Sequence, residues 1–95
     1  MGKTLRKSSS KGRSREQVKR ILHDAFRHRF PHDTVDISDG YEDNVHVLVV
    51  SREFDAMSEK EKQDVMWGVI DSTPLNDREK GLISLVFPVS PAEIK

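Results

Sequence analysis

The chain has 95 residues, with 16 Lys and Arg against 16 Asp and Glu, no cysteine, and 35% hydrophobic residues, which is typical of one small globular domain. The absence of cysteine excludes disulfide frameworks, thiolate nucleophiles and Cys-ligated zinc or iron-sulfur sites. The longest apolar run, 47–50, is far shorter than the ~20 residues that span a bilayer, and the N-terminal segment lacks the apolar core of a signal peptide. We therefore expect a cytoplasmic protein.

The first 15 residues are basic and the rest of the chain is acidic. Six of these 15 residues are Lys or Arg, and the remaining 80 residues hold 10 basic and 16 acidic groups. Because residues 1–14 are rich in Ser and Gly, they cannot bury enough surface to offset the entropy of ordering. We predict a disordered basic arm at 1–14 and an ordered domain at 15–95. The arm is either a nucleic-acid contact or a solvated tail that balances the acidic body. The candidate nucleic-acid residues are Lys3, Arg6, Lys7, Lys11, Arg13 and Arg15.

Two capping boxes predict the main helices. A Ser followed three residues later by Gln or Glu occurs at Ser14 and at Ser58. The first should open a helix that runs to about Phe30, because Pro31 disfavours helical geometry in the residue before it. The second should open a helix through about Ile70. Apolar residues recur every three or four positions in both, which predicts one buried stripe per helix: Val18, Ile21, Leu22, Ala25 and Phe26, then Val65, Met66, Val69 and Ile70.

Two side chains of the second helix fall outside this simple pattern. Trp67 lies off the stripe, and we expect its ring to cover the edge of the core, with a partner-binding aromatic as the alternative. Lys62 projects onto the stripe one turn earlier. We expect its alkyl stem to lie over the core with its ammonium in solvent.

The alternation of residues between the two faces of a strand predicts three strands. Residues 34–38 and 45–51 should form a hairpin across the turn at 39–44, and the second strand, apolar on both faces, should be central or covered on both sides. After a single helical turn closed by Gly81, a third strand should span about 82–87, with Ile83, Leu85 and Phe87 on one face. Pro88 should end that strand or mark an unpaired edge. With a short turn opened by Ser90-Pro91, the order is α-β-β-α-(turn)-β-α.

No catalytic or metal-binding constellation stands out in the sequence. The chain has no phosphate-binding glycine motif, no nucleophile elbow and no zinc-binding His pair on one helix. His23 and His28 are rotated by about 140° from each other on the first helix, so they cannot clamp one metal from one face. His32 and His46 are expected to be structural. We expect no enzyme activity and no bound cofactor or metal.

Residues 46–70 carry a recognisable pattern. A strand ending in Val-Ser is followed by Phe, by a small residue two positions later, and by a helix whose apolar stripe carries an aromatic. Ser51, Phe54, Ala56 and Trp67 have this spacing. This pattern resembles the BolA family, and the segment 90–93, Ser-Pro-Ala-Glu, is similar to the Thr-Pro or Ser-Pro that precedes the last helix of that family.

The resemblance implies an α+β fold of the BolA-like or class II KH-like type, with a three-stranded mixed sheet and helices packed on one face. Members of that family are partners of monothiol glutaredoxins in iron-sulfur cluster trafficking or in iron and stress regulation, and some are DNA-binding regulators. The resemblance therefore implies a non-enzymatic adaptor or regulatory protein, which we expect to be monomeric.

The chain departs from the family at the cluster ligands. The histidine of the family that binds the shared cluster would fall at Gly81 or Leu82, and the loop 39–44 has no His or Cys in place of the second ligand. Cluster ligation of the family type is therefore not expected. The candidate partner-binding residues at this position are Lys80, Gly81 and Leu82. The alternatives are a KH-like nucleic-acid-binding protein that uses the basic arm, and an enzyme, which would need a pocket with convergent polar groups.

Overall fold

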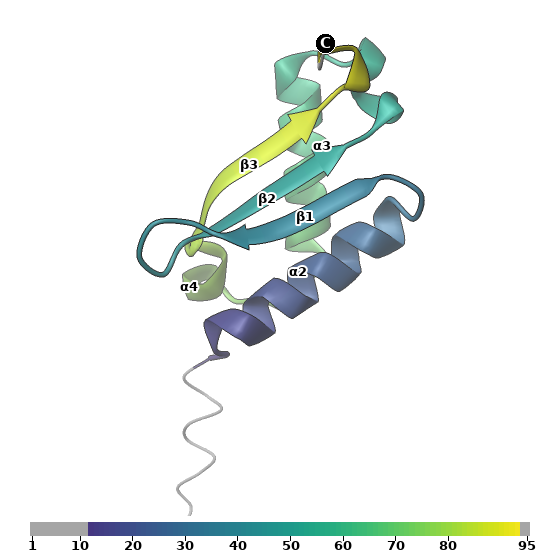
Figure 1. Ribbon diagram of the computed structural model, residues 1–95. Helices are drawn as coiled ribbons and strands as arrows, with labels where there is room; N and C mark the ends of the chain where they lie inside the picture. Colours follow the sequence, from purple (N-terminus) through teal and green to yellow (C-terminus); the bar gives the residue numbers. More distant parts are fainter. Residues whose placement is uncertain (1–11, 94–95) are drawn as a thin grey trace, which may run out of the picture.

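The computed structural model describes residues 12–93 of the chain (Figure 1). Residues 1–11 of the predicted basic arm lie outside the described residues. The elements follow in the order α2 (Arg15–Arg29), β1 (Thr34–Asp39), β2 (Val45–Val50), the 3-10 helix η2 (Arg52–Ala56), α3 (Glu59–Asp71), α4 (Asp77–Lys80), β3 (Ile83–Val89) and the 3-10 helix η3 (Pro91–Glu93). Among the described residues, the helices are all too short or too polar to cross a membrane.

Both predicted capping boxes are present, so the two long helices begin where the sequence predicts. The Ser14 hydroxyl accepts a hydrogen bond from the backbone N–H of Gln17 at 3.2 Å, and the Gln17 side chain accepts one from the Ser14 N–H at 2.9 Å. Ser58 and Glu61 make the same reciprocal pair at the start of α3. Each box satisfies two backbone donors that the first turn of a helix leaves without a partner.

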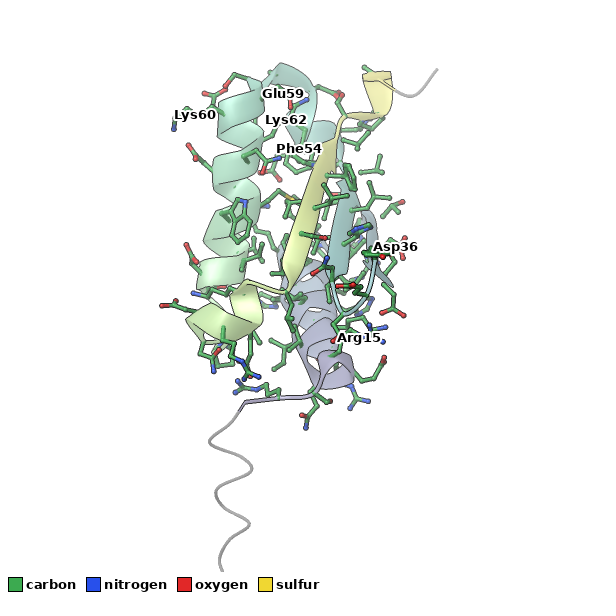
Figure 2. All side chains as sticks on the ribbon, turned by 90° about the vertical axis from the view of Figure 1, so that its left-hand side faces the viewer. Arg15, Asp36, Phe54, Glu59, Lys60 and Lys62 are labelled. Carbon is green, nitrogen blue, oxygen red and sulfur yellow. The ribbon has the colours of Figure 1, made fainter. Side chains whose placement is uncertain are left out.

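The three strands form one mixed sheet in the order β1-β2-β3, which confirms a small α+β domain with β2 at the centre. β1 pairs with β2 in the antiparallel sense and β3 pairs with β2 in the parallel sense. Val45, Val47 and Val49 are fully buried on one face of β2, and Val35 and Ile37 of β1 lie beside them on the same face. The apolar stripes of α2 and α3 cover this face, so the two helices lie on one side of the sheet (Figures 1 and 2).

The core joins these helix stripes to the buried face of the sheet. The Phe30 ring, directly after α2, packs against the Phe54 ring of η2 at a centroid distance of 5.6 Å. Arg29 closes this end, because its guanidinium lies 4.5 Å from the centre of the Phe30 ring and pairs with the Glu53 carboxylate. The buried apolar residues are Val18, Leu22, Phe26, Phe30, Val45, Val47, Val49, Phe54, Met66, Val69, Ile70, Leu75 and Ile83.

β3 differs from the sequence prediction. Its pairing with β2 shifts register at the start of the two strands, which leaves Ser84 as the extra residue of a β-bulge. Ile83 is buried, whereas Leu85 and Phe87 are 44% and 42% exposed. The prediction that these three residues share a face is therefore wrong, because the bulge turns the rest of the strand over. The strand also continues through Pro88, which is tolerated because β3 is an edge strand.

Candidate protein-binding surfaces

The corner between α4 and β3 contains the three residues predicted to bind a partner. The Lys80 ammonium donates a hydrogen bond to a carboxylate oxygen of Asp71 at 3.2 Å. Gly81 is exposed, and Leu82 is half-buried against the core while its carbonyl accepts a hydrogen bond from the N–H of Val45 at 2.8 Å. Lys80, Gly81 and Leu82 are consecutive residues between the end of α4 and the start of β3, and we call this turn the α4–β3 corner.

A buried carboxylate holds this corner in place. The Glu79 side chain is 2% exposed and accepts hydrogen bonds from the N–H of Asn76 at 2.9 Å and from the Arg13 guanidinium at 3.0 Å. The backbone N–H of Arg13 donates to the same carboxylate. The pKa of Glu79 lies below its usual value, chiefly because the backbone N–H of Asn76 stabilises the charged form. Burial raises the pKa, and the contacts from Arg13 lower it further.

Gly12 makes the approach to Glu79 possible. Its φ angle is 106°, a conformation that favours glycine. A Cβ atom at this position would lie 2.9 Å from Glu79 Oε2. Sequence composition missed this contact, although the Asn76–Glu79 spacing is that of a capping box and could have drawn attention to α4.

Of the six candidate nucleic-acid residues, the structure describes Arg13 and Arg15, and both contact acidic parts of the domain. Arg13 binds Glu79, as described above. The Arg15 guanidinium donates to the carbonyl of Glu42 at 2.9 Å and lies within 4 Å of the carboxylates of Asp39 and Asp43. These contacts reduce the positive charge that the two arginines can offer to a phosphate. The other four candidates, Lys3, Arg6, Lys7 and Lys11, lie outside the described residues.

Lys62 of α3 differs from its prediction, whereas Trp67 agrees with it. The Lys62 side chain is 5% exposed, and its ammonium donates to a carboxylate oxygen of Glu59 at 3.1 Å. The ammonium is therefore buried rather than held in solvent, because Glu59 one turn earlier supplies a counter-charge. Trp67 is half-buried and packs against the edge of the core.

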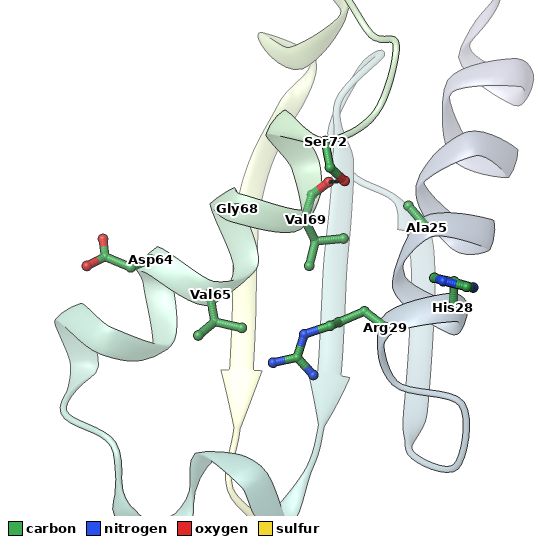
Figure 3. Close-up of a pocket in the computed structure, with 8 residues that line it drawn as sticks. All are labelled: Ala25, His28, Arg29, Asp64, Val65, Gly68, Val69 and Ser72. Carbon is green, nitrogen blue, oxygen red and sulfur yellow. Dashed lines mark hydrogen bonds between the residues drawn. The ribbon is translucent and has the colours of Figure 1, made fainter.

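A shallow groove of about 410 Å³ lies between α2 and α3, on the helix side of the molecule (Figure 3). Four of its lining residues are small or apolar and four are charged or polar. The lining residues are Ala25, His28, Arg29, Asp64, Val65, Gly68, Val69 and Ser72. The guanidinium of Arg29 is bonded to Glu53, and the Ser72 hydroxyl donates a hydrogen bond to the carbonyl of Val69 at 2.6 Å.

Within residues 12–93, no three His, Cys, Asp or Glu side chains are grouped so that they could hold a metal ion.

Comparison of the chain with protein-family models, with curated proteins and with solved structures finds no match.

Proposed function

We propose that this chain is a non-enzymatic, BolA-like adaptor that binds another protein in iron or stress regulation, with a monothiol glutaredoxin as the first candidate partner. The observation that carries the proposal is the mixed sheet, in which a central β2 pairs with an antiparallel β1 and a parallel β3 and the helices lie on one side. This arrangement agrees with the BolA-like or class II KH-like fold that the resemblance of residues 46–70 implies. A shared fold supports a shared role only together with that residue pattern.

The proposed docking point is the α4–β3 corner. Glu79 ties this corner to Arg13 at the start of the described chain, and these contacts restrain the turn. Preorganisation of this kind lowers the entropy cost of association. Lys80 at the corner is paired with Asp71, so a partner carboxylate would compete with Asp71 for its charge.

We further propose that the complex forms without a cluster bound in the family manner. Gly81 and Leu82 have no side-chain atom that binds iron, and the loop 39–44 offers carboxylate and amide oxygens rather than imidazole or thiolate. Iron-sulfur clusters in proteins are held by thiolate and imidazole ligands. Nucleic-acid binding through the arm is less well supported, because Arg13 and Arg15 already contact acidic residues of the domain.

The test is a titration of the full chain with purified monothiol glutaredoxins, followed by gel filtration and calorimetry. We expect a one-to-one complex, and no visible absorbance beyond that of the glutaredoxin alone after anaerobic reconstitution. Lys80→Glu should weaken the complex by about fivefold, the effect of roughly 1 kcal/mol from one rim charge. Lys60→Glu is the matched control, because Lys60 is also paired with one aspartate but lies on α3.

The outcomes separate the parts of the proposal. Failure of every glutaredoxin to bind contradicts the adaptor role, and a new visible spectrum contradicts binding without a cluster. Equal effects of Lys80→Glu and Lys60→Glu contradict the location at the α4–β3 corner. Salt-sensitive binding of the same protein to duplex DNA or single-stranded RNA, with no glutaredoxin complex, would favour the nucleic-acid alternative instead.

A further inference from the structure

The sheet face turned away from the helices carries a continuous apolar patch. Its residues come from the outward positions of the two neighbouring strands β2 and β3, and we call them the open-face patch: His46, Leu48, Val50, Leu85, Phe87 and Val89. Leu85 and Phe87 are the most exposed, and the other four are half-buried. Figure 2 shows this side of the sheet projecting away from α3, with Asp36 of β1 on it.

Register explains why these six residues act as one surface. His46 lies beside Leu85, Leu48 beside Phe87, and Val50 beside Val89 in the β2–β3 ladder. The His46 and Phe87 rings also meet edge to face at 6.3 Å. The patch is therefore two parallel rows of three side chains, with no polar side chain inside it except the imidazole of His46.

The neighbouring strand shows that an apolar outer face is not a general property of this sheet. The outward positions of β1 are Thr34, Asp36 and Ser38, all exposed and polar. They lie directly opposite the three β2 residues of the patch. The open face is thus polar over β1 and apolar over β2 and β3, so the patch has a polar border on its β1 side.

The β-bulge at Ser84 is what displays the patch. Regular alternation from the buried Ile83 would point Leu85 and Phe87 into the core. The extra residue reverses the faces, so that Leu85 and Phe87 point outward and Pro88 is buried. Bulges commonly re-aim side chains at functional surfaces.

The size of the patch selects its occupant. Two strands and their side chains are about 10 Å wide, and five residues of strand are about 17 Å long. An α-helix is about 10 Å wide, and 17 Å corresponds to about 11–12 residues, or three turns. A stable contact between two folded domains needs roughly 800 Å² per partner, several times this footprint. One helix therefore fits the patch, whereas a second copy of the chain would have to recruit much more surface.

The edge and the charge of the sheet disfavour two other occupants. Addition of a strand to β3 is hindered because the Gln63 side chain donates to the carbonyl of Val86 at 3.2 Å and Pro88 has no N–H to offer. A nucleic acid would need basic side chains, but none of the nine outward positions on the three strands is Lys or Arg. The charged residue among them is Asp36, which repels phosphate and attracts a cation.

We propose that the open-face patch binds a basic amphipathic helix of a partner protein. The helix is about three turns long, lays an apolar stripe along β2 and β3, and places a Lys or Arg against Asp36. The acidic excess of residues 16–95 favours the same basic character. This inference goes beyond the adaptor proposal, because it needs no glutaredoxin and uses the sheet rather than the α4–β3 corner.

The test uses a defined probe, a fluorescent 14-residue peptide of Leu and Lys with its leucines at helical spacing. Its companions are the same peptide with Glu in place of Lys and a version of equal composition with strictly alternating residues. The full chain is titrated at physiological salt by fluorescence anisotropy, and amide shifts are followed by NMR. We expect saturable binding of the helical Lys peptide, shifts centred on β2 and β3, and at least tenfold weaker binding of both companions.

Variants of the chain locate the site. The double variant Leu85→Ser, Phe87→Ser should bind the Lys peptide at least tenfold more weakly, and Asp36→Asn about threefold more weakly with a smaller salt dependence. Tyr41→Ser is the matched control, because Tyr41 is an aromatic residue 79% exposed in the β1–β2 loop, outside the patch. Unchanged thermal unfolding of each variant confirms that it is folded.

Several results would overturn the inference. These are undiminished binding by the double variant, shifts centred on the helices, equal binding of the Lys and Glu peptides, or self-association of the wild type that the double variant loses. The double variant is also tested with glutaredoxin. Because Lys80→Glu and the double variant change different elements, loss of glutaredoxin binding and loss of peptide binding can be told apart.

Discussion

The Glu79 side chain is 2% exposed, and its hydrogen bonds come from two distant parts of the chain. The Asn76 N–H belongs to its own helical turn, whereas Arg13 is 66 residues earlier. Charged groups are seldom buried unless they are paired in this way. The consequence is that the residues just before α2 are fixed on α4, next to the α4–β3 corner.

Replacing either of two glycines by alanine should change the stability of the domain, in opposite directions. Gly12→Ala should destabilise the domain by about 1–3 kcal/mol, because φ is positive and the new methyl would crowd the Glu79 carboxylate. Gly68→Ala should stabilise it by about 0.5–1 kcal/mol, because Gly68 lies inside α3 and its methyl would meet no atom within 4 Å. Urea unfolding of both variants measures the difference, and changes of the same sign would contradict it.

At the scale of single residues, the sequence predicts contacts between residues that are close in the chain and misses contacts between residues that are far apart in it. The capping residues Ser14 and Ser58 were predicted because their partners are three positions away. The bond between Arg13 and Glu79 could not be predicted, because nothing near either residue reports on the other. For the same reason the composition of residues 1–14 gave no sign that Gly12 approaches a buried carboxylate.

At the scale of elements, helices were predicted more closely than the third strand. Apolar residues at three- and four-residue spacing lie on one side of a helix, so Val18, Leu22 and Phe26 could only share the buried side of α2. The sequence of β3, Ile-Ser-Leu-Val-Phe-Pro-Val, has apolar residues at both odd and even positions, so either face could be the buried one. The bulge at Ser84 decides between them, and alternation alone does not reveal it.

Two single-residue deletions in β3 test this assignment. Deleting Ser84 removes the bulged residue and leaves every later side chain on its present face, so stability should change by no more than about 1 kcal/mol. Deleting Val86 keeps the bulge but turns Phe87 inward and Pro88 outward, which should cost at least about 3 kcal/mol through overpacking and a register slip. Thermal and urea unfolding compare the two. Equal stability of the two deletions would refute the bulge.

At the scale of the whole molecule, the order of elements and the central position of β2 were predicted correctly, because hairpin spacing and apolar content report on them. Which side of the sheet stays open could not be predicted, since β2 has apolar residues on both faces. The helices cover the face with Val45, Val47 and Val49 and leave Leu48 on the other. The open-face patch is therefore a property of the assembled fold rather than of any one segment.

Ion pairs are spread over the whole domain, but they differ in how strongly salt affects them. The pKa of Asp39 is lowered first by its hydrogen bond from Lys19, and the pKa of Glu53 first by its hydrogen bond from Arg29. Both carboxylates are more than a third exposed. Salt at 1 M shortens the Debye length to about 3 Å, so these exposed pairs should contribute little to the pH dependence of stability there.

Glu79 should keep its effect at high salt. The pKa of Glu79 is lowered in the folded state, chiefly by the hydrogen bond from the Asn76 backbone and then by Arg13. The stability that Glu79 contributes is therefore complete above the pKa of the unfolded state, near 4.5. It is lost as the pH falls through the lower pKa of the folded state. In 1 M NaCl the free energy of unfolding should therefore be flat from pH 7 to about 5 and should fall below that. Glu79→Gln should be less stable at pH 7 by about 1–3 kcal/mol and show a shallower decline, because Gln keeps the shape but not the charge. Urea unfolding at pH steps between 7 and 3 measures both curves, and parallel curves would show that Glu79 is not the group that couples folding to acid.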